Sequence, residues 1–243
     1  MRMTSETRSR AVVYFVFAVI LMSALVCAGD QNSRGVIAGI VVNEAGSPVA
    51  DVHVMTRDLD PNTVEVFAGV VPYFATDQQG KFLIPELTVG HPYKIYAEKE
   101  EDEYPNTMLG MYNPKDEAPV AVATLTAQAQ VVTVRIGPKA GRLKWNVADA
   151  VTGYYIDKPT IFFQRTDTRT FQRIDTGAST DVSEFAGNGV LVPSNTDLIV
   201  EVSARGYREW YYPGTFDKGT AAPLRLLPGE ERTLQVQLRP SAK

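Results

Sequence analysis

The chain has 243 residues, of which 44% are hydrophobic and 21% are charged, and its formal net charge is −4. These proportions are those of a folded globular protein and exclude wholesale disorder. The negative net charge predicts no nucleic-acid partner, because such partners require a basic surface. One cysteine and two histidines exclude an intrachain disulfide and leave few ligands for a zinc centre.

The first 28 residues have the form of an export signal. Three arginines among the first ten residues precede an apolar run over residues 11–26, and the small residue Ala28 is followed by polar positions. This order predicts a secretory signal peptide over residues 1–28 that is cleaved after Ala28. The apolar run is shorter than the roughly 20 residues of a membrane-spanning helix, which favours cleavage over an uncleaved anchor.

Two other fates of this leader stay open, namely an uncleaved membrane anchor and lipidation of Cys27. Val26 stands before Cys27, where a lipoprotein signal has a small residue, so loss of the cysteine with the leader is favoured. The predicted location is secreted, periplasmic or at the cell surface. A mature chain without a thiol fits an oxidising compartment. Membrane contact is expected only through an uncleaved or lipidated leader.

Short runs rich in β-branched and aromatic residues follow the leader, separated by Gly, Pro, Asn and Asp. Several alternate apolar and polar residues, and a period of two predicts strands with one face in a core. No stretch of a dozen residues carries a convincing helical stripe, and residues 118–130 come nearest to one. The predicted strands cover residues 36–42, 49–56, 81–84, 93–97, 131–136, 143–147, 160–164, 198–203 and 233–238.

The second half of the chain repeats landmarks of the first. Leu-Ile-Pro at residues 83–85 is matched by Leu-Val-Pro at residues 191–193. Other proline-containing landmarks recur in the same order, again about a hundred residues apart, which is the commonest domain size. The chain is therefore predicted to be all-β, with two tandem Greek-key-type antiparallel β-sandwiches over residues 35–138 and 139–243.

Turn motifs in both halves resemble those of a known family. The first half has Gly-Ser-Pro at residues 46–48 between two apolar runs and Thr-Asp-Gln-Gln-Gly at residues 76–80 before another. The second half closes with Tyr-Tyr-Pro-Gly-Thr at residues 211–215 and Leu-Pro-Gly-Glu at residues 227–230, but lacks the Thr-Asp-x-x-Gly motif. These motifs resemble carboxypeptidase regulatory-like domains. The resemblance implies a transthyretin-like sandwich that accompanies a zinc carboxypeptidase and has no peptidase chemistry of its own.

The physics of these turns agrees with the resemblance. Gly46 and Gly80 can adopt positive φ, which turns of this kind require. The Asp77 carboxylate can accept hydrogen bonds from backbone amides two residues further on. Phe82 and Ile84 then share one face of the strand that follows, which predicts that both face the core.

Candidate catalytic and metal-binding residues are few. His53 lies in an alternating strand and His91 in a turn, and neither has a glutamate at zinc-ligand spacing. The acidic run at residues 98–103 lacks the Asp/Asn alternation and central glycine of a calcium loop; it is predicted to be a solvated loop, as are Asp58 and Asp60. No Gly-x-Ser-x-Gly motif is present. The sequence therefore predicts no enzyme, no metal and no cofactor.

An aromatic cluster near the C-terminus is the most interesting surface candidate. It contains Tyr207, Trp210, Tyr211 and Tyr212, whose rings could stack on the apolar faces of sugars or contact a protein partner. Aromatic residues at a strand end also commonly fill a sandwich core. The region around Tyr112 in the first half has methionine and leucine instead, which favours packing.

These observations predict an exported, non-catalytic protein that serves as an adhesion, scaffolding or accessory module. Its expected partner is an unidentified protein or glycan at the cell surface. The alternative is a carbohydrate-binding module that uses the aromatic cluster of the second domain.

Overall fold

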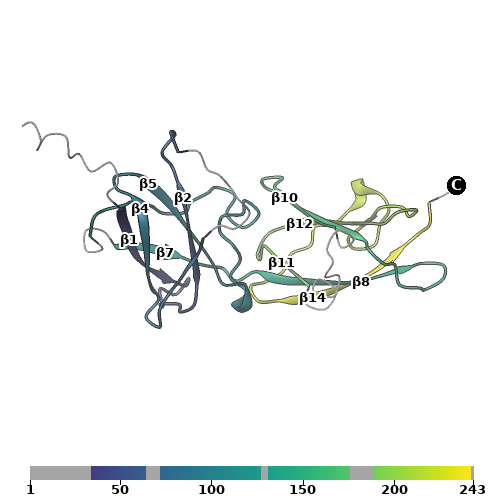
Figure 1. Cartoon of the computed structure of the whole chain (residues 1–243). Helices are drawn as coiled ribbons and strands as arrows, with labels where there is room; N and C mark the ends of the chain where they lie inside the picture. Colours follow the sequence, from purple (N-terminus) through teal and green to yellow (C-terminus); the bar gives the residue numbers. More distant parts are fainter. Residues whose placement is uncertain (1–33, 64–71, 127–130, 176–188, 242–243) are drawn as a thin grey trace, which may run out of the picture. The chain divides into compact units, whose positions relative to one another are not determined.

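The structure, a computed structural model, describes residues 34–63, 72–126, 131–175 and 189–241 (Figure 1). Over these ranges it contains fourteen strands and two short 3₁₀ helices. The predicted signal peptide, with Cys27 and Ala28, lies outside the described residues. In the described part of the chain, no helix is long and apolar enough to cross a membrane.

The first seven strands form one sandwich of two sheets. They are β1 (Arg34–Val42), β2 (His53–Asp58), β3 (Phe74–Ala75), β4 (Lys81–Thr88), β5 (Pro92–Glu98), β6 (Val120–Val122) and β7 (Val131–Arg135), with the helix η1 (Glu100–Asp102) after β5. The strand orders are β4-β1-β7 and β3-β2-β5-β6. Inward residues of both sheets, among them Val41, Ile84, Ile95 and Val134, form a single core.

The next seven strands repeat this arrangement. They are β8 (Gly141–Asp149), β9 (Thr160–Arg165), β10 (Phe171–Asp175), β11 (Val190–Val192), β12 (Leu198–Ser203), β13 (Trp210–Tyr211) and β14 (Glu231–Leu238), with the helix η2 (Lys218–Thr220) before β14. The orders β11-β8-β14 and β10-β9-β12-β13 are those of the first sandwich advanced by seven strands. A second core includes Leu143, Phe163, Val200 and Val236.

The predicted class, two tandem all-β sandwiches, is confirmed, with one correction to the strand directions. Antiparallel pairing was expected throughout, but β1 pairs with β7 in parallel and β8 pairs with β14 in parallel. These partners are the first and last strands of each sandwich. No tight hairpin joins them, so nothing local requires them to run in opposite directions.

All nine predicted runs are strands, although β2 begins at His53 and not at residue 49. Five further strands were missed, namely β3, β6, β10, β11 and β13, and each has two to five residues. Strands this short offer too few alternating positions for a period of two to be recognised.

The predicted turn between β3 and β4 has the expected geometry. Gly80 adopts φ +72°, and Asp77 Oδ1 accepts hydrogen bonds from the backbone N–H groups of Gln79 (2.9 Å) and Lys81 (2.8 Å). Phe82 and Ile84 are both buried, with 5% and 1% exposure. The shared inward face predicted for these two residues is confirmed.

Candidate functional site

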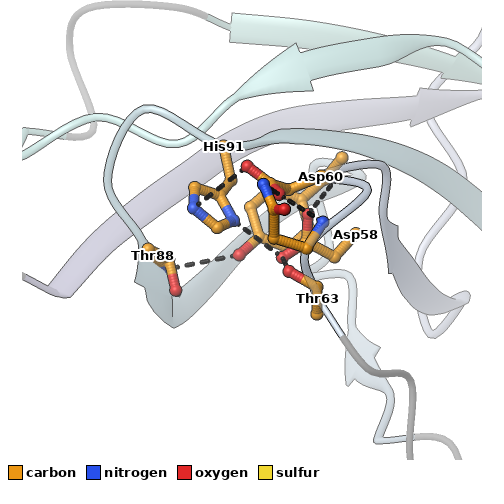
Figure 2. Close-up of polar contacts among 7 residues, drawn as sticks. Asp58, Asp60, Thr63, Thr88 and His91 are labelled. Carbon is orange, nitrogen blue, oxygen red and sulfur yellow. Dashed lines mark hydrogen bonds and ion pairs between the residues drawn. The ribbon is translucent and has the colours of Figure 1, made fainter.

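A polar cluster lies where the end of β2 meets the turn that precedes β5 (Figure 2). The His91 ring stands between two carboxylates, with Nδ1 3.0 Å from Asp58 Oδ2 and Nε2 3.5 Å from Asp60 Oδ2. The Thr63 hydroxyl also donates to Asp58 Oδ2, at 3.1 Å. The fold therefore brings together three residues that sequence analysis considered separately, His91, Asp58 and Asp60.

Contacts within the cluster shift the pKa values of His91 and Asp58. The hydrogen bond with Asp58 raises the pKa of His91, and the negative charges of Asp58 and Asp60 act in the same direction. Burial acts to raise the pKa of Asp58, but hydrogen bonds from the Asp60 backbone, His91 and Thr63 outweigh burial and lower that pKa. The charged forms of the imidazole and of the Asp58 carboxyl therefore stabilise each other.

This arrangement links the end of β2 to the turn before β5. A nucleophile would need to share its proton with the His91 ring, whereas the Thr63 hydroxyl is directed to Asp58. Across the described ranges, no group of three or more His, Cys, Asp or Glu side chains is arranged to hold a metal ion.

The other histidine and the acidic run have separate local partners. His53 stacks on Tyr73 with ring centroids 4.0 Å apart, and its Nδ1 lies 3.8 Å from Glu98 Oε1. In the acidic run, Asp102 forms an ion pair with Lys99 at 2.8 Å. The run was predicted to be a solvated loop, and the structure places the helix η1 within it.

Two members of the aromatic cluster are buried. Trp210 and Tyr211 are each 4% exposed, and Trp210 belongs to the core of the second sandwich. Tyr207 and Tyr212 are partly buried against the same core. An indole in this position has little surface left for a sugar ring, so its burial favours the packing interpretation.

The hydroxyl groups of two cluster tyrosines are also occupied. The Tyr211 hydroxyl donates to Glu209 Oε2 at 2.6 Å, and the Tyr207 hydroxyl donates to Asp149 Oδ2 at 2.9 Å. Burial, followed by the bond to Glu209, raises the pKa of Tyr211. The bond to Asp149 raises the pKa of Tyr207. Both phenol groups therefore stay protonated, and their hydroxyl groups are bonded to carboxylates of the protein itself.

Residues from the first half of the chain complete the second core. Met111, in the segment between β5 and β6, is 4% exposed and lies within that core, and Tyr112 packs against it. The Tyr112 hydroxyl donates to the Leu191 carbonyl at 2.7 Å. Burial raises the pKa of Tyr112, so the hydroxyl keeps its proton for this bond. Residues 35–243 form one compact unit.

Two polar side chains of the second sandwich reinforce this contact. Arg165 Nη1 donates to the Met111 carbonyl at 3.0 Å, while its Nε and Nη2 bind the Asp167 carboxylate. The Ser194 hydroxyl donates, at 2.7 Å, to the carbonyl of Lys139 in the segment that joins β7 to β8. We call the set formed by Met111, Tyr112, Arg165 and Ser194 the inter-sandwich joint.

Sequence analysis missed Arg165 and Ser194 as members of this joint. The available signal was the position of Arg165, which follows Ile161 and Phe163 on the inward face of β9. Arg165 is only 9% exposed, and buried charges need partners. Bonding to Arg165 lowers the pKa of Asp167 to about 2, so this partner stays ionised.

Comparison with known proteins identifies no family, because no family model and no curated protein matches the chain. Among solved structures, the chain is similar to the Bacillus anthracis TIE protein (12% identity, TM-score 0.31), over 86% of this chain and 34% of that one. It is also similar to a streptococcal ancillary pilin (11% identity, TM-score 0.33), over 88% of this chain and 64% of that one.

A third similarity is to the shaft pilin SpaA of Lactobacillus rhamnosus GG, with 8% identity and a TM-score of 0.30, over 86% of this chain and 99% of that chain. The chain thus spans about a third of the TIE protein and less than two thirds of the ancillary pilin. At these identities and TM-scores the similarities assign neither family nor function.

Proposed function

We propose that this protein is an exported, non-catalytic module that acts in adhesion, in scaffolding or as an accessory to another protein at the cell surface. The observation that carries the proposal is the inter-sandwich joint. Met111 is buried in the second core and bonds through its carbonyl to Arg165, so residues of the first half complete the packing of the second. Two sandwiches joined by such contacts can hold attached groups at a set separation, as a scaffold requires.

The carboxypeptidase regulatory-like relationship is part of the same proposal. It is supported by the Asp77–Gly80 turn and by positive φ at Gly46 (+81°), which are the conformations that the shared motifs demand. Such a domain would act beside a separately encoded enzyme and carry out no chemistry itself. Turnover of peptide, ester or glycoside substrates by the purified protein would contradict this.

The joint can be tested by unfolding, because the chain has an internal reporter. Both tryptophans, Trp145 and Trp210, lie in the second core, so tryptophan fluorescence follows that sandwich and far-UV circular dichroism follows both. We expect one coincident denaturant transition for the wild-type protein. Tyr112→Ala should lower the fluorescence midpoint and separate the two signals, since it removes a partly buried ring and its hydrogen bond.

A suitable control is Tyr154→Ala, because Tyr154 is 78% exposed and should leave both signals unchanged. Two separate transitions in the wild-type protein, unaltered by Tyr112→Ala, would show that the sandwiches fold independently and would refute the joint. Cell fractionation with surface proteolysis tests the location. An intact protein recovered only from the cytoplasm would refute the proposed export.

A further inference from the structure

Strands β11, β8 and β14 form one sheet (Figure 1). Three paired residues form a row on its outer face. Ala148 in β8 is paired with Tyr155 on one side and with Gln237 in β14 on the other. Their neighbours Val147 and Val236 are buried in the core, so the three side chains point outward. The row spans two interstrand spacings, about 10 Å. Because the Ala148 side chain is only a methyl group, the surface between Tyr155 and Gln237 is recessed.

A second row lies two residues away on the same face. Asn146 is paired with Gln235, and its Nδ2 donates to Gln235 Oε1 at 3.4 Å. Gln237, the next outward residue of β14, is exposed. The three amides offer several donors and acceptors to a ligand. Together with Gly153 and Tyr155 they line a cleft of about 150 Å³.

The lining of this cleft contains no charged residue. A larger open cleft of about 730 Å³ shares Gln235 and Gln237 with it. The lining of the larger cleft includes Arg239, whose guanidinium lies 5.0 Å from the centroid of the Phe216 ring. Lys144, the preceding outward residue of β8, is neutralised by Glu231, with Nζ 2.8 Å from Oε1. A face of amides beside an exposed tyrosine suits an extended, neutral, polyhydroxylated ligand.

The fold does not require these residues, because the first sandwich has the same strand order without them. There the corresponding row is Pro48, Val42 and Arg135, and the second row is Ile40 and Thr133. An aromatic ring and an amide therefore occupy positions that the first sandwich fills with proline and arginine. This difference points to a role beyond packing for the amide face, by which we mean Tyr155, Asn146, Gln235 and Gln237.

We propose that the amide face binds a neutral polysaccharide chain. The Tyr155 ring, which is 59% exposed, stacks on the apolar face of one sugar ring. The Asn146, Gln235 and Gln237 amides bond to hydroxyl groups of that sugar and its neighbour. This inference rests on the proposed function, that of a non-catalytic module at the cell surface.

The test is affinity electrophoresis of the full mature chain in gels containing amylopectin, dextran, barley β-glucan, xyloglucan or galactomannan, with alginate as the acidic comparison. We expect retardation by at least one neutral polysaccharide and none by alginate. Tyr155→Ala should weaken retention roughly tenfold, the order expected from loss of a stacking aromatic. Gln237→Ala should weaken it less.

Tyr154→Ala is the matched control, since it removes an adjacent exposed tyrosine that does not line the cleft. It should leave retention unchanged, and all variants should keep the wild-type melting temperature. Passage through every neutral gel, binding to alginate alone, or full retention of Tyr155→Ala would each overturn the inference. None of these results alters the unfolding of the joint, so the failure of this site and the failure of the proposed scaffold are distinguishable.

Discussion

Replacement of Trp210 by alanine separates the two interpretations of the C-terminal aromatic cluster. The indole is 4% exposed and packs in the core of the second sandwich. Removal of a large buried aromatic side chain costs about 3–5 kcal/mol of folding free energy, through lost burial and the cavity that remains. For a chain of this size the loss corresponds to a decrease of roughly 6–20 °C in melting temperature.

The measurement is thermal and guanidinium unfolding followed by circular dichroism, with Trp145 as the remaining fluorophore. The exposed-site variant Tyr154→Ala serves as the control and should stay within about 0.5 kcal/mol of the wild-type protein. A Trp210→Ala variant that loses less than about 1 kcal/mol of stability and no longer binds a polysaccharide would refute our reasoning. Trp210 would then be an open sugar platform.

Two further predictions concern the His91 cluster and the leader. Because the folded-state pKa of His91 is raised, its stabilisation is complete below its unfolded pKa of about 6.5 and disappears as the pH rises through the folded value. Guanidinium unfolding at acidic and alkaline pH should show this loss, and His91→Gln should abolish it; an unchanged pH profile in that variant would contradict the role of His91. N-terminal sequencing of the exported protein should begin at Gly29, whereas a modified Cys27 in first place would identify a lipoprotein.

Strand positions could be predicted from this sequence because most strands are long enough to alternate. In β14, Leu234, Val236 and Leu238 face inward and Gln235 and Gln237 face outward, as a period of two requires. The strands that were not predicted are short and lie at the edges of their sheets. Trp210 and Tyr211, which make up β13, are both buried, so no alternation marks them.

The sites were harder to predict because they depend on pairing between distant segments. Asp58 and His91 are 33 residues apart, and they meet only because β2 pairs with β5. Met111 is a loop methionine in the sequence and a core residue in the fold. Nothing in its neighbours along the chain identifies the sandwich that it completes.

The repeated strand order provides a way to separate the requirements of the fold from those of function. In each sandwich the first strand lies at the centre of a three-stranded sheet, between the fourth and last strands. Its inward residues, such as Val41 and Val147, are fully buried and serve the core. Its outward residues lie outside that core, and Ile40 and Asn146 differ at equivalent positions, as the ligand site proposed for the amide face predicts. For this reason a ligand should be sought on the second sandwich, and on its outward amides before its buried aromatics.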